Sequence, residues 1–544
     1  MTRKLIPPDR EFTGVFRTDE PARAVYAEAA GIGRVMPLAV AVPASTDDVP
    51  VLVEWARTQE VSLVPRASGS SMPGGAIGHG VIVDLSRLDS IGEADRAGRR
   101  VTVGPGAIRN HVDARAAIAG LRFPVDPSSG AFCTIGGMVS TNAAGARTLR
   151  FGATRRWVRA LDCVFADGTR AVVRRGETAP RVPTIDRFLE MADWRSLVPN
   201  GSVTLRKNSS GYGLHDFARS GELVDLLVGS EGTLALFVGV ELDLTDRAGA
   251  TASLLASYAS LDLAVIGAGA ARRGDASACE LLDRTFLDFA SRASPLPIPD
   301  GTEAVLVIEL EAEDAPSAEE RARSLAVDLE RTGATAVTIG LDHEQEERLW
   351  ALRHAASPIL SRLDPSLKSM QFIEDGVVPP ARLADYVRGV RAALAAHDTP
   401  GVIFGHAGDA HVHVNPLVDV RRSGWRDRVA GILDDVVNLT ATLGGSLSGE
   451  HGDGSLRAPL LDRTTDASLL ELDRRVKHAF DPDGLFNPGV KIPLADQRAV
   501  GDIKYDPTLP SLPDAAVRVL ARVERDRAYA EFRLAMLEQE ERSG

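Results

Sequence analysis

Short apolar runs, each closed by Gly, Pro or an Asp-Gly turn, recur between residues 37 and 245. Runs of this length are typical of buried strands, and we predict strands over 61–64, 81–84, 161–165 and 226–228. A helical pattern occupies about 47–59, with candidate N-cap residues at 45–47. This alternation predicts an α+β domain.

The pattern changes from about residue 250, where long Ala/Arg/Glu/Leu segments predict helices. We expect helices over 317–332, 343–363, 381–396 and 424–443, alternating with single strands such as 304–310. A second α+β domain is the economical interpretation. The tail from about 496 has a Pro-containing linker and then one charged amphipathic helix from 514 to about 538. That helix either packs on the protein's own surface or docks a partner subunit.

The composition narrows the class of protein. The 544 residues carry a net charge of −13 and 44% apolar residues, as in a soluble globular protein of two or three domains. An acidic chain argues against nucleic acid as the main partner. Cys133, Cys163 and Cys279 are scattered, which predicts a reducing compartment, no disulfide framework and no iron–sulfur cluster in this chain.

We expect neither a transmembrane segment nor a signal peptide, because no apolar run is long enough to cross a bilayer and prolines break the N-terminus. A cytoplasmic location is the default expectation, and peripheral attachment at the inner membrane through a partner stays open.

Two segments near the C-terminal end, 405–416 and 448–454, hold four of the eleven histidines beside carboxylates and glycines. Residues 412–414 read as a strand, so His411 and His413 should project to the same face. His406 precedes a Gly-Asp turn that could fold it back toward that face. With Glu450 and His451 nearby, these residues are the inventory of a divalent-metal site beside a catalytic base.

Small-residue loops indicate a large polar ligand. Residues 64–71 follow one predicted strand and 74–80 lead into the next, which suits a diphosphate nest of backbone N–H groups. The G-x-G-x-x-G fingerprint is absent, which argues against an NAD-type site. Two further stretches, 124–145 and 227–234, place glycine, hydroxyl and amide groups where backbone must approach a ligand closely.

Together these motifs resemble the FAD-binding domain of the vanillyl-alcohol-oxidase-type flavoproteins. More closely, the chain is similar to the FAD-linked D-2-hydroxyacid dehydrogenases, a family that includes D-lactate dehydrogenase, the glycolate oxidase flavin subunit and D-2-hydroxyglutarate dehydrogenase. The resemblance runs from about residue 37 to Asn487-Pro488-Gly489.

The resemblance implies an α+β architecture with a two-lobed FAD-binding domain, an α+β substrate (cap) domain and a helical tail. Its implied boundaries are an N-terminal segment at 1–36, the FAD-binding domain at 37–246 and the metal-bearing cap at 247–479. The chain would return to the flavin domain at 480–495, and the tail would occupy 496–544.

The resemblance also implies the cofactor-binding residues. They are Pro65, Arg66, Ala67, Ser68, Gly69, Ser70, Ser71, Pro127, Ser128, Ile135, Gly136, Gly137, Asn142, Gly145, Glu231, Gly232 and Asn487. The loop at 66–71 would surround the diphosphate, Glu231 would lie near the adenosine end, and Asn487 would return to the flavin. Ala67 and Ser68 depart from the usual Gly-rich loop. Covalent attachment of FAD is not expected.

For catalysis the resemblance implies that His406, His413 and Glu450 ligate a divalent ion, with zinc as the expected metal, and that His451 is the base. Arg353 would bind the substrate carboxylate, with Ser357, Lys368 and Asn415 as further catalytic candidates. His411 replaces the usual Asn, so a substrate contact, a metal contact and a plain neighbour role all stay open.

The implied reaction is oxidation of a D-2-hydroxyacid to the 2-oxoacid by hydride transfer to flavin N5. Residues 372–375 and 448–454 look like those of dehydrogenases fused to iron–sulfur modules. We therefore expect a separate electron acceptor, either an iron–sulfur protein, an electron-transfer flavoprotein or a quinone, and a homodimer is a further option. The alternatives are an alkylglycerone-phosphate-synthase-type flavoenzyme, a phenol or alcohol oxidase, and a non-catalytic flavin-binding subunit.

Overall fold

The computed structural model describes residues 5–9, 11–191, 205–292, 296, 298–354, 366–501, 503–527 and 530–541. The first apolar runs form a four-stranded sheet in the order β1-β2-β4-β3, in which β2, β4 and β3 run parallel. Helix α2 (Asp48–Thr58) connects β2 to β3 and buries its apolar side against the sheet, as predicted. The strands are β1 (Val15–Arg17), β2 (Ala39–Val42), β3 (Leu63–Arg66) and β4 (Val81–Asp84).

A second, antiparallel sheet follows in the order β5-β9-β7-β8, and the short strands β6 and β10 pair beside it. The predicted strand at 226–228 is wrong, because this run lies in helix α9 (Leu223–Leu227), where all five residues are buried. A short apolar run cannot by periodicity alone be told from a buried helix. The strands are β5 (Arg100–Val103), β6 (Leu121–Arg122), β7 (Val158–Val164), β8 (Arg170–Arg174), β9 (Leu236–Asp243) and β10 (Thr245–Asp246).

Short helices connect these strands. They are α1 (Glu20–Val25), α3 (Arg109–Ile118), α4 (Ile135–Thr141), α5 (Thr148–Phe151), α6 (Pro183–Leu189), α8 (Leu214–Ser220) and the 3-10 turn η1 (Thr154–Trp157). Among them, α4 begins at an N-cap threonine, Thr134, whose hydroxyl accepts from the Gly137 amide.

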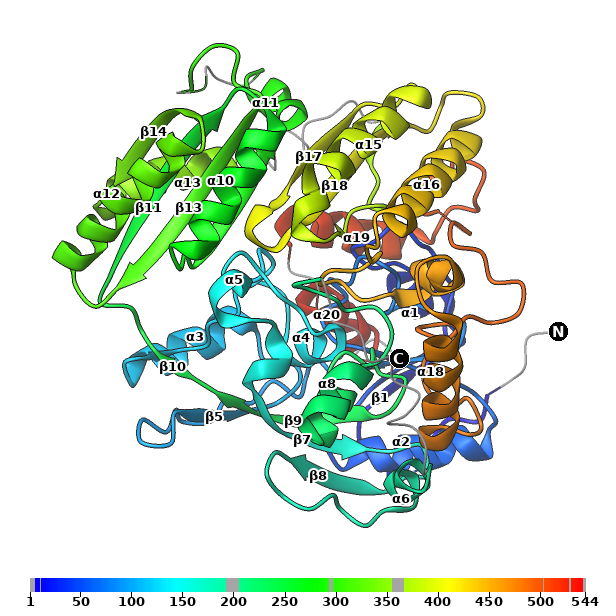
Figure 1. Ribbon diagram of the computed structural model, residues 1–544. Helices are drawn as coiled ribbons and strands as arrows, with labels where there is room; N and C mark the ends of the chain where they lie inside the picture. The colour runs from blue at the N-terminus through cyan, green and yellow to red at the C-terminus, as the bar shows by residue number, and fades with distance from the viewer. Residues whose placement is uncertain are drawn as a thin grey trace.

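An antiparallel sheet from the second half of the chain has the order β14-β11-β13-β12-β17-β18-β15, with β16 also paired to β18. Figure 1 shows this sheet above the blue and cyan N-terminal part, with green and yellow helices along it. The strands are β11 (Ala250–Tyr258), β12 (Ala278–Asp283), β13 (Ala304–Ala312), β14 (Ala334–Gly340), β15 (Leu367–Ser369), β16 (Gly376–Val377), β17 (Gly401–His406) and β18 (His411–Asp419).

The two faces of this sheet differ in chemistry because side chains alternate along each strand. Leu254, Leu306 and Val412 project into a large apolar core with the helices that cover one face. The opposite face carries Glu280, Glu309 and the hairpin histidines, and it turns toward the first half of the chain, where Arg147 binds Glu309 with two hydrogen bonds. The helices are α10 (Leu261–Arg273), α11 (Arg284–Ala290), α12 (Ala315–Arg331), α13 (His343–His354), α15 (Leu383–Ala396) and α16 (Trp425–Thr442).

The remaining helices close the chain back onto its first half. The predicted single tail helix is two helices, α19 (Asp514–Asp526) and α20 (Glu531–Glu541), since Arg527 adopts the left-handed conformation with φ 57°. Both pack against α1, so the tail lies on the protein's own surface. The others are α17 (Gly454–Arg457), α18 (Ala467–Phe480) and the 3-10 turns η2 (Pro380–Arg382), η3 (Ala407–Asp409) and η4 (Ala458–Arg463).

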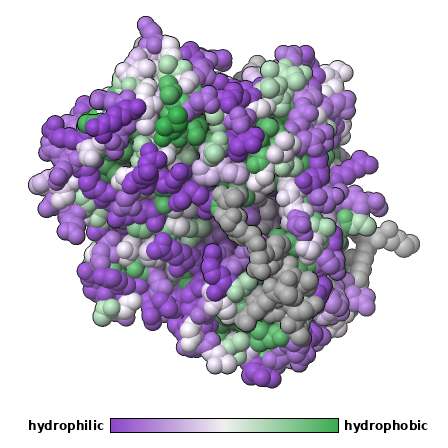
Figure 2. All heavy atoms as spheres, in the orientation of Figure 1, coloured by the Kyte–Doolittle hydropathy of each residue, from purple (hydrophilic) through white to green (hydrophobic). Residues whose placement is uncertain are grey.

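Hydrophilic side chains dominate the face of the molecule seen in Figure 2. Within the described ranges, no helix is both long and apolar enough to span a bilayer. The predicted boundary at 246/247 falls between β10 and β11, which belong to different sheets, and the division into domains stays a prediction.

Candidate active site

The histidines of the 405–416 segment converge because a hairpin pairs their strands. His406 on β17 lies directly opposite His411 on β18, and Phe404 lies opposite His413. The ligand atoms of the three histidines and Glu450 all lie within 4.8 Å of one another. The predicted shared face of His411 and His413, and the return of His406 toward it, are therefore confirmed.

Three of these atoms have the spacing of metal ligands. Nε2 of His406 lies 3.3 Å from Nε2 of His413, and Oε1 of Glu450 lies 3.5 Å from the first and 3.4 Å from the second. Ligands about 2.0–2.2 Å from a tetrahedral ion lie roughly 3.3–3.6 Å apart. Two imidazole nitrogens and a carboxylate oxygen also suit zinc or another borderline divalent ion. The residues thus fit a divalent cation.

Hydrogen bonds at the outer nitrogens point both Nε2 atoms at this common position. Nδ1 of His406 lies 2.5 Å from Oε1 of Glu280, and Nδ1 of His413 lies 2.9 Å from the carbonyl of Glu374. Each acceptor takes the proton of Nδ1, so in the neutral ring, the form that ligates a metal ion, the lone pair is on Nε2. Oε2 of Glu450 accepts from the buried ammonium of Lys207 at 3.2 Å, which leaves Oε1 for the histidine pair.

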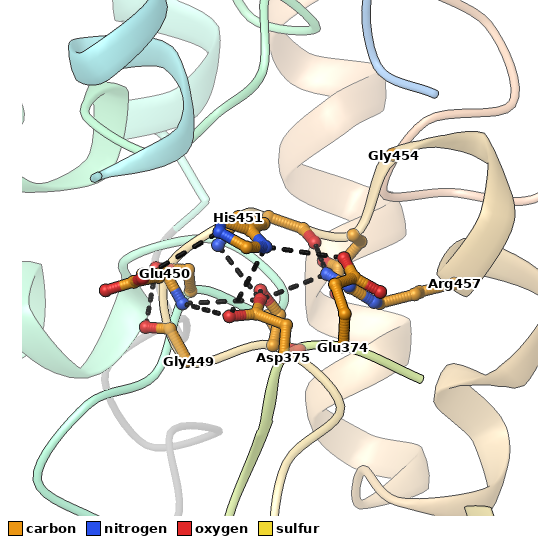
Figure 3. Close-up of polar contacts among 12 residues, drawn as sticks. Glu374, Asp375, Gly449, Glu450, His451, Gly454 and Arg457 are labelled. Atoms are coloured by element: carbon orange, nitrogen blue, oxygen red, sulfur yellow. Dashed lines mark hydrogen bonds and ion pairs between the residues drawn. The ribbon is translucent and has the colours of Figure 1, made fainter. Parts of the chain in front are cut away.

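His451 follows Glu450 and is held by two carboxylates (Figure 3). Its Nδ1 lies 3.3 Å from Oε1 of Glu374, and its backbone N–H donates to Asp375. Burial alone would lower the pKa of His451, but the charge of Asp375 and the hydrogen bond to Glu374 outweigh burial and raise the pKa to about 9. Such an imidazole needs a nearby positive charge to release its proton near neutral pH, and the ligand set beside it is where a cation would bind.

Arg353 on α13 reaches the same face of the sheet. Its Nε donates to Oε2 of Glu280 at 2.9 Å, and its guanidinium carbon lies 4.4 Å from the centre of the Phe404 ring. Glu280 therefore holds Arg353 with one oxygen and His406 with the other. Burial alone would raise the pKa of Glu280, but His406 and Arg353 together lower it to about 2.

One cavity of about 2000 Å³ is lined by Glu280, Arg353, His406, His413, Glu450 and His451, and also by Lys368 and Asn415. Ordinary small-molecule pockets measure roughly 300–1,000 Å³, so this cavity has room for a dinucleotide-sized cofactor together with a small substrate. Ser357 lies outside the described residues. The opposite wall is built by most of the predicted cofactor residues, namely Pro65, Arg66, Ala67, Ser68, Gly69, Ser70, Ser71, Pro127, Ser128, Gly136, Gly137, Gly145, Glu231 and Gly232.

Comparison with known proteins agrees with this geometry. Residues 37–174 match the family described as "FAD binding domain", and residues 248–490 match "FAD linked oxidases, C-terminal domain". A D-2-hydroxyglutarate dehydrogenase of Xanthomonas citri pv. viticola is 31% identical over 83% of this chain and 89% of its own length. The chain belongs to the FAD-linked oxidase family. It is a flavoprotein oxidoreductase of the group whose members act on 2-hydroxyacids.

Other relatives are named for glycolate or again for D-2-hydroxyglutarate. The glycolate oxidase subunit GlcD of Bacillus subtilis is 28% identical over 84% of this chain and 88% of its own length. The D-2-hydroxyglutarate dehydrogenase of Escherichia coli is 31% identical over 88% of this chain, which spans only 50% of that relative. Among solved structures, a 4-ethylphenol oxidase from Gulosibacter chungangensis superposes with a TM-score of 0.65 at 14% identity, covering 88% of this chain and 94% of its own. The match supports the predicted vanillyl-alcohol-oxidase-type fold.

Within the flavoenzyme's cofactor loop, Arg66 turns inward. Its guanidinium donates to the backbone carbonyls of Tyr26, Glu28 and Ala76, and only 2% of the residue is exposed. Burial, reinforced by the charge of Arg533, lowers the pKa of Arg66 to about 9. Arg66 therefore shapes the loop through these backbone contacts, and binding of an anion by the loop's backbone N–H groups stays a prediction.

Three predicted cofactor residues lie behind the cavity wall. Ile135 is fully buried, Asn142 accepts a hydrogen bond from the Arg155 amide, and the Asn487 amide donates to the carbonyls of Gly75 and Glu231. The carboxylate of Glu231 is itself bound by the backbone N–H groups of 453 and 454, two and three residues after His451. Contact between these residues and FAD stays a prediction.

The tail, which lies beyond the matched family regions, also lines the cavity through Tyr505, Leu520 and Arg533. The buried guanidinium of Arg533 donates to the carbonyls of Val25 and Ser68 at 3.0 and 3.4 Å, so α20 supports the cofactor loop from behind. At the other end, Nζ of Lys368 lies 5.5 Å from the centre of the Tyr505 ring.

Sequence reasoning missed several polar residues at this site. Lys207 and Glu280 belong to no recognisable site motif. Arg457 binds both Glu374 and Asp375 and is buried, although it follows the Gly-rich segment by only three residues. A charged residue within an otherwise apolar strand, as Glu280 is in β12, was the one signal available.

Proposed function

We propose that this flavoenzyme oxidises a D-2-hydroxyacid to the corresponding 2-oxoacid. One observation carries the proposal: Glu280 binds both Arg353 and His406 inside the cofactor cavity. The guanidinium of Arg353, which suits a substrate carboxylate, is thus held at a fixed distance from the metal-ligand set, which suits a substrate hydroxyl. The carboxylate and hydroxyl of a 2-hydroxyacid sit on neighbouring carbons, which is the pairing this arrangement requires.

Each residue has a defined task in this proposal. Arg353 binds the substrate carboxylate through the part of its fork that Glu280 does not use. His451 removes the hydroxyl proton, with Nδ1 held by Glu374 so that Nε2 is the basic atom. When bound, FAD supplies the hydride acceptor, and the divalent ion, with zinc as the expected metal, supplies a Lewis acid that lowers the pKa of the hydroxyl. Asn415 and Lys368 line the cavity beside them and are candidates for orienting the rest of the acid.

The identity of the acid depends on the group beyond the 2-carbon. D-lactate and glycolate need no further charge, whereas D-2-hydroxyglutarate has a second carboxylate that requires a cation. Lys368 is the candidate cation. Lys368→Met is expected to raise KM strongly for D-2-hydroxyglutarate and little for D-lactate. Electrons then pass to a separate acceptor, for which an iron–sulfur protein, an electron-transfer flavoprotein and a quinone are the candidates.

Anaerobic mixing tests the proposal. D-lactate, glycolate and D-2-hydroxyglutarate are each mixed with the FAD-loaded protein, and the flavin absorbance near 450 nm is followed, with the L-enantiomers of the chiral acids as controls. We expect one D-acid to bleach the flavin and His451→Ala to slow that reduction about 10²–10⁴-fold. His343→Ala, at a surface histidine whose side chain is 89% exposed, is the matched control. Bleaching by none of the acids, or full-speed reduction in His451→Ala at equal FAD content, would refute the proposal.

The main support for a second candidate, a non-redox flavoenzyme, is the shared fold. An alkyldihydroxyacetonephosphate synthase superposes with a TM-score of 0.59 at 15% identity, over 87% of this chain and 82% of its own. The same mixing experiment separates the two, because a non-redox enzyme leaves the flavin oxidised with every acid. A non-catalytic flavin subunit would also leave it oxidised, and it has no need of the Arg353–Glu280–His406 arrangement.

A further inference from the structure

His411 is buried at the centre of the ligand set, and its two ring nitrogens have different surroundings. The residue is 0% exposed, and its ring centre lies 4.7 Å from that of His413 and 5.3 Å from that of His406.

The proton of His411 is fixed on Nε2. That atom lies 2.8 Å from Oδ1 of Asp375. Asp375 also accepts from the His451 N–H, the Ser448 hydroxyl and the Arg457 guanidinium, so its carboxylate acts as an acceptor toward His411 as well. Nδ1 therefore carries a lone pair.

Within the described part of the chain, nothing donates a hydrogen bond to this buried Nδ1. It lies 3.9 Å from Oε2 of Glu450, an acceptor that cannot satisfy it. A buried acceptor without a donor costs about 1–3 kcal/mol. A cation is the partner that an imidazole lone pair accepts, and a carboxylate on the opposite nitrogen is the arrangement by which proteins orient metal-binding histidines.

The contacts of Glu450 limit the number of ligand atoms that it can supply to an ion. Lys207 binds its Oε2, while its Oε1 faces His406 and His413, so the carboxylate can offer the ion only one oxygen. With one oxygen and two imidazoles, a tetrahedral ion has one open position. The ligand atom of His411 lies within 4.8 Å of each of the other three, which a small side-chain rotation converts to ligand spacing.

We propose that His411 is the fourth protein ligand of the divalent ion, binding through Nδ1 with Asp375 as its orienting partner. This inference rests on the metal site of the proposed function. The chain then offers three imidazoles and one carboxylate. The 2-hydroxyl of the substrate would then have to be a fifth ligand, and the nitrogen-rich set would favour zinc or cobalt over manganese.

X-ray absorption at the zinc edge of the FAD- and Zn²⁺-loaded protein tests this directly by counting imidazole ligands. We expect three in the wild type and two in His411→Asn, whose amide can still donate to Asp375. We also expect the zinc dissociation constant, measured by chelator competition, to rise at least tenfold in His411→Asn. His397→Asn is the matched control, because Nε2 of His397 also binds a carboxylate, Asp435, at 2.8 Å but lies outside the site.

The outcomes separate the two proposals. Two imidazoles in the wild type, or an unchanged zinc affinity in His411→Asn, would overturn the role of His411 and leave the rest of the metal site intact. A wild type that binds neither Zn²⁺ nor Co²⁺ would overturn both this inference and metal assistance in the proposed function. The wild-type ligand count decides the question even if the variant fails to fold, and retained FAD content shows whether it has folded.

Discussion

Glu280→Gln isolates the carboxylate that joins the two halves of the proposed site. Glu280 is 1% exposed and accepts with both oxygens, Oε1 from His406 and Oε2 from Arg353. Glutamine has the same shape but only one acceptor oxygen. Since arginine cannot give up its proton, we expect the amide oxygen to turn to Arg353 and the NH₂ group to face Nδ1 of His406. His406 must then carry its proton on Nε2, the atom predicted to ligate the ion.

The structure sets the size of this effect. The pKa of Glu280 falls from 4.5 to about 2, a shift worth about 3 kcal/mol of interaction with its two partners. Because the folded-state pKa is lowered, this stability is present above about pH 4.5 and lost as the pH falls toward 2. In the substituted protein we expect a loss of up to about 3 kcal/mol in unfolding free energy at pH 7 when no metal is added. Zinc affinity should fall about 10–100-fold, as for other partners that orient ligating histidines.

Denaturant unfolding at pH 7 measures the unfolding free energy, and chelator competition measures the zinc affinity. The KM for the reactive acid is a third readout. Glu309→Gln is the matched control, because Glu309 is also buried in the cavity and bound by an arginine, Arg147, but does not contact a histidine of the site. Its zinc affinity should be unchanged. If Glu280→Gln binds zinc as tightly as the wild type, the tautomer argument is wrong.

Three further predictions concern buried charges. Lys207→Met should lower the unfolding free energy by about 3–5 kcal/mol without metal and by less with zinc, whose charge replaces the ammonium; an equal loss in both titrations would contradict this. Asp473→Asn should stabilise the protein more at pH 8 than at pH 5, because burial raises the folded-state pKa of Asp473 from 3.8 to about 7, so the penalty grows between these two values and is complete above pH 7. Unfolding curves at both pH values check it, with a gain of up to about 4 kcal/mol at pH 8. Arg533→Met should weaken FAD binding by roughly tenfold, since the loop loses the hydrogen bond from Arg533 to the Ser68 carbonyl, worth about 1 kcal/mol. Flavin fluorescence in a dilution series measures the affinity, and the exposed Arg518→Met on the neighbouring helix should leave it unchanged.

Local patterns predicted much of the fold because they depend on neighbours in the chain. The 48–58 helix and the 304–312 strand follow from periodicity, and so does the common face of His411 and His413. The errors are also local in origin. The 226–228 run is too short for its period to be read, and the break of the tail at Arg527 depends on a left-handed residue that is not glycine.

By itself, the sequence determined which chemical groups are available: a flavin-binding scaffold, a histidine-rich hairpin and an arginine suited to a carboxylate. Only the tertiary structure decided how these groups are supported. Glu280 meets His406 across 126 residues because β12 and β17 are neighbours in the sheet, and Lys207 meets Glu450 across 243. Such contacts depend on the order of the strands and the packing of the two halves, and no spacing along the chain encodes them. The free lone pair of His411 likewise exists because Asp375, 36 residues away, fixes its other nitrogen.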